Sequence, residues 1–199
     1  MPVETPETPA RAIVDTNVLL VADGAHPGAP PACVARCALA LQRVMTEVGH
    51  VFLDSNGLIL NEYGNKTNAG QPGPGAAFLK WLYNNHANPA RCTKVAITRA
   101  SDDPNVADDF TELAALAAQP PNSRPSIDVS DRKFIAVAAA SSEHPPVLQA
   151  VDSKWVGWVS ALAACGVVVH LLCPEHITKI HAGKMKAKKG AARRRGLLR

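Results

Sequence analysis

Short apolar runs alternate along the chain with longer stretches in which apolar and polar positions follow a helical period. We predict β-strands at the apolar runs 12–15, 50–53, 94–98, 147–151 and 167–172. Helical periodicity and capping residues predict helices at 31–48, 76–86, 108–118, 130–142 and 155–165, and a shorter helix that follows the polar residues 54–56 and ends near residue 63. Because strands that alternate with helices form a mostly parallel sheet covered on both faces, we expect a three-layer α/β/α fold.

Length and composition favour one domain with additions at its ends. A chain of 199 residues with 47% hydrophobic content can bury a single sizeable core. Residues 1–10 are acidic and rich in proline, so we expect a flexible N-terminus there. The folded domain is predicted at 11–178, and a basic tail follows at 179–199.

The net charge of +4 conceals an uneven distribution. Nine of the 21 Lys and Arg lie in the tail, which has no acid, so positions 1–178 hold 12 basic and 17 acidic residues and a net charge of −5. A basic tail of this kind suits a phosphate backbone, although a solvated tail without a dedicated partner is an equal alternative. The candidate nucleic-acid-binding residues are Lys184, Lys186, Lys188, Lys189, Arg193, Arg194 and Arg195.

Cysteine usage and the N-terminus favour a reducing compartment. The five cysteines form no CxxC pair, are odd in number and lie mostly in apolar runs, so we expect buried thiols in a cytoplasmic protein. The first nine residues lack the basic and apolar regions of a signal peptide. Residues 155–174 contain no charged side chain over 20 positions, which is long enough for a membrane span. Gly166 divides this stretch into a helix and a strand, however, so we expect no membrane association.

Two aspartates follow predicted strands directly. Asp15 comes after the first apolar run, and Asp152 comes after the run 147–151. Open α/β sheets bind ligands at the carboxyl edge of their strands, and a buried carboxylate needs donors or a cation. Together the two acids suggest a site for a divalent metal ion, whereas each one alone is equally well explained as a helix cap.

Two further acids lie on faces that should turn towards the core. Glu62 follows Leu58 by four residues and Ile59 by three, and Asp131 opens the helix that buries Phe134 and Ile135. Alternatively, Glu62 extends to solvent at a helix end, and Asp131 only complements the helix dipole. Asp128, one turn earlier, is the rival to Asp131.

The four acids stand in motifs that resemble those of the PIN-domain nucleases, in the same order. The motifs are IVDTNVLL around Asp15, LILNEYGNK around Glu62, VSDRKFIAVA around Asp131 and AVDSKW around Asp152, and the resemblance covers about 11–175. It implies a parallel-sheet fold in which these four carboxylates converge on Mg²⁺ or Mn²⁺. It also implies that the protein cleaves single-stranded or structured RNA. Thr16, Asn17 and Ser153 match supporting positions of the family.

The chemistry that the resemblance implies needs no protein nucleophile. Asp15 and Asp152 are assigned to direct coordination, and Glu62 and Asp131 are further ligands or orient metal-bound water. Four acids in one pocket repel each other and raise some of their own pKa values, so bound metal should stabilise the site. The section 64–125 and the basic tail are additions to the shorter members of the family, which leaves a toxin role and a protein antitoxin as open expectations.

Three alternatives remain at this point. The chain is either a nuclease or a PIN-like RNA-binding module or scaffold that does not cut. A phosphotransferase with Asp15 as nucleophile is disfavoured, because that chemistry needs a second aspartate where this chain has Asn17.

Phe78, Trp81 and Tyr83 are better explained by core packing or a homodimer surface than by base stacking. The seven histidines show no spacing typical of zinc ligands.

Overall fold

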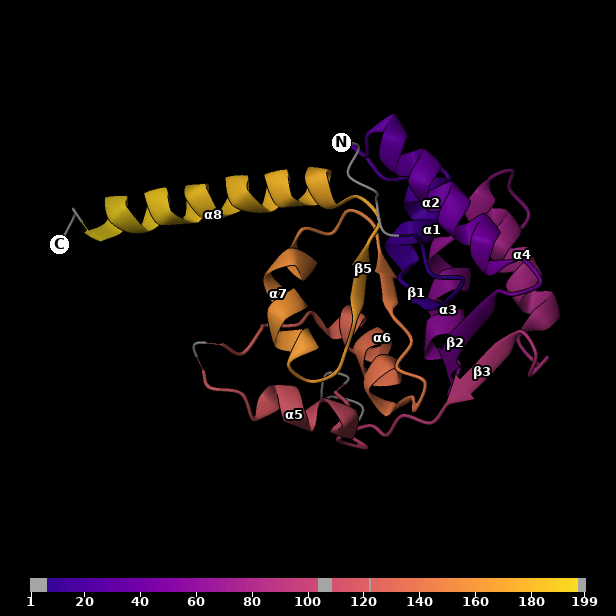
Figure 1. The fold of residues 1–199 in the computed structure, drawn as a ribbon. Helices are drawn as coiled ribbons and strands as arrows, with labels where there is room; N and C mark the ends of the chain where they lie inside the picture. The colour runs from indigo at the N-terminus through magenta and orange to yellow at the C-terminus, as the bar shows by residue number, and fades with distance from the viewer. Residues whose placement is uncertain (1–6, 104–108, 122, 197–199) are drawn as a thin grey trace.

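The computed structural model describes residues 7–103, 109–121 and 123–196. Within them the chain forms a sheet of five parallel strands in the order β3-β2-β1-β4-β5 (Figure 1). The strands are β1 (Arg11–Val14), β2 (His50–Asp54), β3 (Cys92–Val95), β4 (Val147–Gln149) and β5 (Val169–Leu171). The predicted α/β/α fold with a parallel sheet is therefore confirmed, and here every strand pair is parallel.

Strand β1 lies at the centre of the sheet and determines where the acids meet. It pairs with β2 through Ala12 and Val51 and with β4 through Ile13 and Val147. Residues 12–14 are fully buried, as expected for a strand covered on both faces. Because β1 and β4 are parallel neighbours, the residues that follow them lie side by side at the carboxyl edge.

Helices cover both faces of the sheet (Figure 1). One layer contains α1 (Thr16–Ala22), α2 (Pro31–Val44) and α4 (Pro74–Asn85), which pack against one another. In the other layer, α6 (Val129–Ala140) packs on β1, β2 and β4, and α7 (Lys154–Ala163) packs on β5. Helix α3 (Leu58–Lys66) contacts α1, α6 and β2, so it bridges the two layers beside the carboxyl edge.

Some element boundaries differ from the prediction for local reasons. Helix α1 was not predicted, because five of its seven residues are buried and no polar stripe marks a helical period. Helix α2 ends at Val44 rather than at residue 48, since Gly49 brings the chain back against the Val44 carbonyl, where a Cβ would lie 1.9 Å from the oxygen. The helix expected at 108–118 is reduced to the 3₁₀ turn η1 (Thr111–Leu113) and α5 (Ala114–Ala117), and residue 108 lies outside the described residues.

The uncharged stretch 155–174 is divided as expected. Helix α7 ends at Ala163, Gly166 adopts a left-handed conformation with φ +78°, and β5 follows. Within the described residues, no helix combines the length and the apolar character needed to cross a bilayer.

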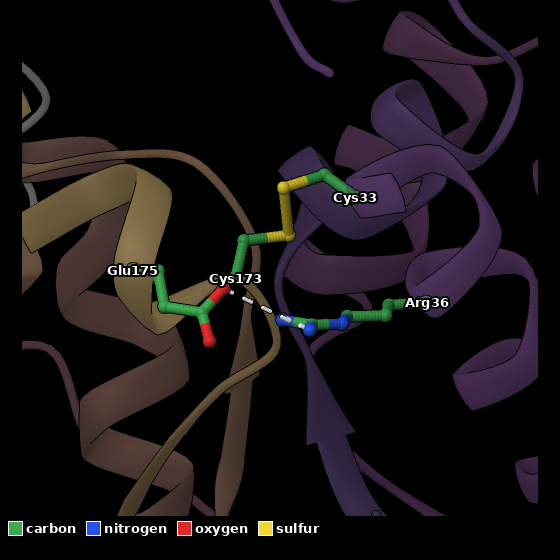
Figure 2. Close-up of a disulfide and its surroundings, with 4 residues drawn as sticks. All are labelled: Cys33, Arg36, Cys173 and Glu175. Carbon is green, nitrogen blue, oxygen red and sulfur yellow. Dashed lines mark ion pairs between the residues drawn. A yellow bond between two sulfur atoms is a disulfide. The ribbon is translucent and has the colours of Figure 1, made fainter. Parts of the chain in front are cut away.

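A disulfide joins Cys33, in the first turn of α2, to Cys173, which directly precedes α8 (Pro174–Gly196) (Figure 2). The expectation of five thiols is therefore wrong for this pair, which is separated by 140 residues in sequence and by 5.6 Å between Cα atoms. Arg36 and Glu175 form an ion pair of 3.8 Å beside it. Sequence spacing could not predict this pairing, because it depends on the order of β1, β4 and β5 in the sheet. Cys37 and Cys92 are buried free thiols, as predicted.

Helix α8 continues without a break across the boundary expected at 178/179. Its first turns pack on the domain, with Ile177 fully buried and the His181 ring in a 2.8 Å hydrogen bond with the Ser153 carbonyl. Residues 182–188 are all exposed, and the helix extends away from the domain past α7 (Figure 1). Over the described side chains the basic tail is therefore a helix that contacts the domain near its base and is exposed from there to Lys188.

Candidate metal centre

Asp15 lies at the junction between β1 and α1 and is only 2% exposed. Its Oδ1 accepts a 2.7 Å hydrogen bond from the Asn17 backbone N–H, so it caps α1. Its Oδ2 is also buried but has no hydrogen-bond partner among the described residues. Asp15 is therefore both a cap and a carboxylate with one free oxygen, which is what a binding role requires.

Asp131 and Asp152 bring two more carboxylates to the same edge. Asp131 lies in the first turn of α6 and is 7% exposed. Asp152 follows β4, and its Oδ1 accepts a 3.0 Å hydrogen bond from the backbone N–H of Lys154. Both acids repel Asp15 electrostatically, as does Glu62 from α3. Asp131, Asp152 and Glu62 therefore lie near enough for their charges to act on Asp15, and the four predicted acids come from four different parts of the fold.

Burial and mutual repulsion raise the pKa values of the two innermost acids. Burial, and then the charge of Asp131, raises the pKa of Asp15 from 3.8 to about 8 despite the opposing hydrogen bond from Asn17. Burial, followed by the charges of Asp152 and Asp128, raises the pKa of Asp131 from 3.8 to about 7. Near neutral pH the cluster of Asp15, Glu62, Asp131 and Asp152, called the acidic pocket below, therefore favours protons or a cation over bare carboxylates.

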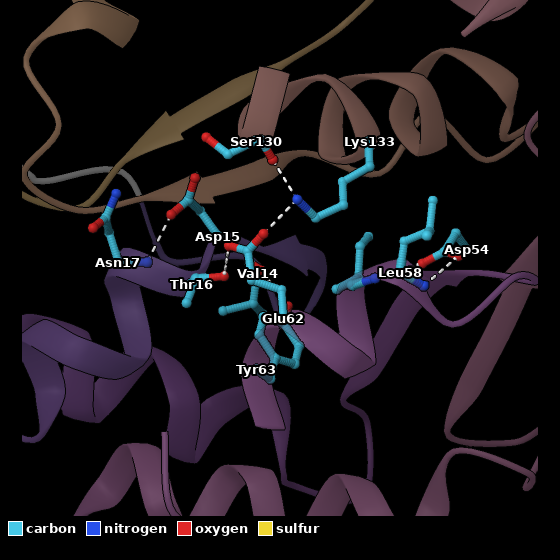
Figure 3. Close-up of polar contacts among 11 residues, drawn as sticks. Val14, Asp15, Thr16, Asn17, Asp54, Leu58, Glu62, Tyr63, Ser130 and Lys133 are labelled. Atoms are coloured by element: carbon cyan, nitrogen blue, oxygen red, sulfur yellow. Dashed lines mark hydrogen bonds and ion pairs between the residues drawn. The ribbon is translucent and has the colours of Figure 1, made fainter. Parts of the chain in front are cut away.

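Glu62 has partners for both of its oxygens (Figure 3). The Thr16 hydroxyl donates a 2.6 Å hydrogen bond to Oε1, and the Lys133 ammonium forms an ion pair with Oε2. Lys133 also donates a hydrogen bond to the Ser130 carbonyl and is only 8% exposed. Glu62 is consequently held by protein groups, whereas Asp15 keeps a free oxygen.

Two neighbouring residues fix α3 relative to the sheet. The Tyr63 hydroxyl donates a hydrogen bond to the carbonyl of Val14, the last residue of β1 (Figure 3). Asp54, at the end of β2, accepts 2.8 Å hydrogen bonds from the backbone N–H groups of Leu58 and Ile59, as expected for the predicted cap. These contacts hold Glu62 next to β1.

Asp128, the rival to Asp131, occupies a different place. It is the N-cap residue of α6, and its carboxylate forms an ion pair with the Lys154 ammonium. Its side chain is 41% exposed, whereas Asp131 is buried. Asp128 therefore lies at the rim of the pocket, and Asp131 lies inside.

The base of α8 contacts this rim directly. Ser153, next to Asp152, is 1% exposed, and its hydroxyl accepts a 2.9 Å hydrogen bond from the Lys184 ammonium. Lys186 and Lys188 are exposed further along the helix. The side chains of Lys189, Arg193, Arg194 and Arg195 lie outside the described residues. The basic helix thus begins beside the acidic pocket.

The described side chains do not form a finished metal site. Across residues 7–103, 109–121 and 123–196, no group of three or more His, Cys, Asp or Glu is arranged to hold an ion. Mg²⁺, however, takes only one or two carboxylates directly and completes its shell with water. The free Oδ2 of Asp15, with Asp131 and Asp152 nearby, fits that requirement.

Comparisons of the chain with protein-family models, with curated proteins and with solved structures gave no match. The resemblance to PIN domains therefore stays a prediction from the sequence motifs.

Sequence reasoning missed Lys133. The signal was present, because a lysine stands two residues after Asp131 in a helix that is otherwise apolar from Phe134 onward. A lysine one turn before the buried Val137 lies on the inner face of that helix and needs a buried partner.

Proposed function

We propose that this protein is a metal-dependent nuclease that hydrolyses phosphodiester bonds of RNA, with Mg²⁺ or Mn²⁺ as its cofactor. The observation that carries the proposal is the buried, unpartnered Oδ2 of Asp15 among acids from four elements. A buried carboxylate oxygen without a donor is costly, and a divalent cation removes that cost.

The residues have distinct roles in this proposal. Asp15 and Asp152 would hold the ion directly, and Asp131 would orient the attacking water. When bound, the ion would polarise the phosphate and lower the pKa of the attacking water. Asn17 fixes the Asp15 carboxylate through its backbone N–H, which engages Oδ1 and leaves Oδ2 without a partner among the described residues. Thr16 and Lys133 hold Glu62 beside the other acids.

The basic helix supplies the argument for a nucleic acid as substrate. Its base is tied to Ser153, the residue after the ligand Asp152, by Lys184 and His181. Its exposed lysines then lead away from the pocket. A strand whose phosphates lie along α8 would pass the acidic pocket, which explains why a cationic element and a cation-binding pocket are adjacent.

A non-catalytic RNA-binding module is the second candidate, because of one specific observation. Both oxygens of Glu62 are engaged by Thr16 and Lys133, as in a site whose charges are balanced internally. Under this alternative the chain binds RNA through α8 and does not cut it with any divalent ion.

Asp15→Asn is expected to reduce Mn²⁺-dependent or Mg²⁺-dependent RNA cleavage by at least about 100-fold, because residues that merely orient metal ligands are already worth about 10- to 100-fold. The assay uses the full chain on end-labelled single-stranded RNA, hairpin RNA and single-stranded DNA, with each metal and with EDTA. Asp128→Asn is the matched control, and we expect nearly full activity because Asp128 lies at the rim. Binding of RNA without cleavage in wild-type protein would favour the non-catalytic alternative.

Neutralising Lys186 and Lys188 to Gln is expected to weaken RNA binding and to flatten its salt dependence. Each phosphate contact that is lost on a single strand lowers the slope of log K against log salt by about 0.7, so the pair should lower it by about 1.4. The matched control is Lys80→Gln with Lys94→Gln, which removes equal charge from exposed positions on the domain. Equal slopes for both double variants would show that α8 makes no dedicated contact.

Two finer parts of the proposal follow from the family resemblance alone, namely membership of the PIN family and a toxin role with a protein antitoxin. A homodimer and a cytoplasmic location are expectations from the aromatic residues and from the cysteines of the sequence. The Cys33–Cys173 disulfide weighs against the last of these, because disulfides rarely persist in a reducing compartment.

A further inference from the structure

Lys133 is a buried cation inside an acidic pocket. Its side chain is 11% exposed, and its ammonium is shared between Glu62 Oε2 and the Ser130 carbonyl. The ammonium also lies 4.8 Å from the centroid of the Phe134 ring. A lysine rarely accepts such burial unless an anion nearby requires it.

The position of Lys133 divides the four acids into two groups. Both carboxylate oxygens of Glu62 are engaged. The Thr16 hydroxyl donates a hydrogen bond to Oε1, and the Lys133 ammonium forms an ion pair with Oε2. Among the described residues the buried Oδ2 of Asp15 has no hydrogen-bond partner, and the charges of Asp131 and Asp152 act on this carboxylate. The Lys133 ammonium thus neutralises Glu62. The carboxylates of Asp15, Asp131 and Asp152 remain available to bind a cation.

Formal charges and the contacts of Glu62 together indicate how many divalent ions this arrangement takes. The pair of Glu62 and Lys133 is neutral, and the three remaining carboxylates carry a charge of −3 when ionised. One divalent ion leaves a net charge of −1 and two leave +1, so the charges alone do not decide. A second ion at Glu62 would have to displace Lys133 from Oε2 and would leave its buried ammonium without an anion, which is costly, so occupation by one ion is favoured.

We infer that Lys133 takes the place of a second metal ion, so that the pocket binds one divalent cation, on the side of Asp15, Asp131 and Asp152. The inference rests on the proposed metal-dependent function and states its metal stoichiometry. Lys133 is then a positioning residue that holds Glu62 and excludes an ion from that side.

The test measures Mn²⁺ bound per full-length chain at pH 8, by equilibrium dialysis with free Mn²⁺ read by electron paramagnetic resonance. We expect one ion for the wild type and two for Lys133→Met, which frees Glu62 while it keeps a side chain of similar length. The double variant Lys133→Met with Glu62→Gln removes both charges and is expected to return to one ion. Lys154→Met removes the rim lysine that pairs with Asp128 and is expected to keep one ion.

The outcomes separate this inference from the proposed function. Two ions in the wild type would overturn the inference and leave a metal-dependent nuclease standing. A single ion in a folded Lys133→Met variant, or a second ion in Lys154→Met, would also overturn it. No saturable Mn²⁺ in the wild type would overturn both proposals. If Lys133→Met fails to fold, the wild-type count of one or two still decides.

Discussion

Asp15→Asn is expected to raise the free energy of unfolding of the metal-free protein at pH 8 by at least about 2 kcal/mol. The amide keeps an oxygen for the 2.7 Å hydrogen bond from Asn17 N–H and carries no charge in a position that is 2% exposed. The measurement is urea unfolding in EDTA at several pH values between 4 and 8. Most substitutions of buried polar residues are destabilising, so the sign is informative.

The sign follows from proton linkage. The pKa of Asp15 is about 8 in the folded protein, against 3.8 for the ordinary group. As pH rises from about 4 to 8, the unfolded chain loses this proton while the folded chain keeps it, so stability falls by up to about 1.4 kcal/mol per pH unit. Asp131, with a pKa of about 7, adds to the loss between about pH 4 and 7. Asp15→Asn removes the first contribution, so the stability profile should become flatter.

Asp54→Asn is the matched control. Asp54 is also 2% exposed and is the last residue of a parallel strand, but both of its oxygens accept backbone N–H groups. In Asp54→Asn the amide NH₂ would meet one of the backbone N–H donors, so one hydrogen bond would be lost and the variant should be less stable than the wild type. It should not flatten the dependence of stability on pH. A loss of stability in Asp15→Asn at pH 8 would contradict the assignment of Asp15 as a desolvated carboxylate.

The second large effect is stabilisation by metal. At a free Mn²⁺ concentration of 100 times the Kd, binding to the folded state alone adds about 2.7 kcal/mol to the free energy of unfolding. We expect this gain at pH 8 and little of it at pH 5, where protons compete for Asp15 and Asp131. Thermal unfolding with Mn²⁺ and with EDTA at both pH values measures it.

The same experiment on two variants identifies the site. Asp15→Asn should lose the gain, and Asp54→Asn should keep it although its starting stability is lower. An equal gain at pH 5 and pH 8, or an undiminished gain in Asp15→Asn, would place the bound ion elsewhere on the protein.

On both predictions, the acidic pocket lowers the free energy of unfolding of the protein when no cation is bound. Among the described residues the Oδ2 of Asp15 has no donor, and the charge of the buried Asp131 acts on the same carboxyl group. Lys133 relieves the repulsion on the Glu62 side only. A pocket whose acids destabilise the metal-free protein is typical of a binding site and not of a structural ion-pair network.

The acids of the candidate site could be found from the sequence because each has a local signal. Asp15 and Asp152 follow apolar strands, and Glu62 and Asp131 lie on apolar helical faces. The parallel α/β pattern then places strand ends at one edge. The sequence did not reveal that Glu62 would be engaged by Thr16 and Lys133, because that contact depends on how α3 and α6 meet across β1.

Hydrophobic periodicity and charge, which are local properties, determined the strands, most helices, the layer arrangement and the identity of the candidate acids. Tertiary structure alone decided the Cys33–Cys173 disulfide, the Asp15 oxygen that has no partner among the described residues, the pairing of Lys133 with Glu62 and the attachment of α8 at Ser153. Each of these depends on groups far apart in the chain, separated by up to 140 residues. The physical reason is that periodicity specifies which face of an element is buried, whereas the partner of a buried group depends on the packing of neighbouring elements.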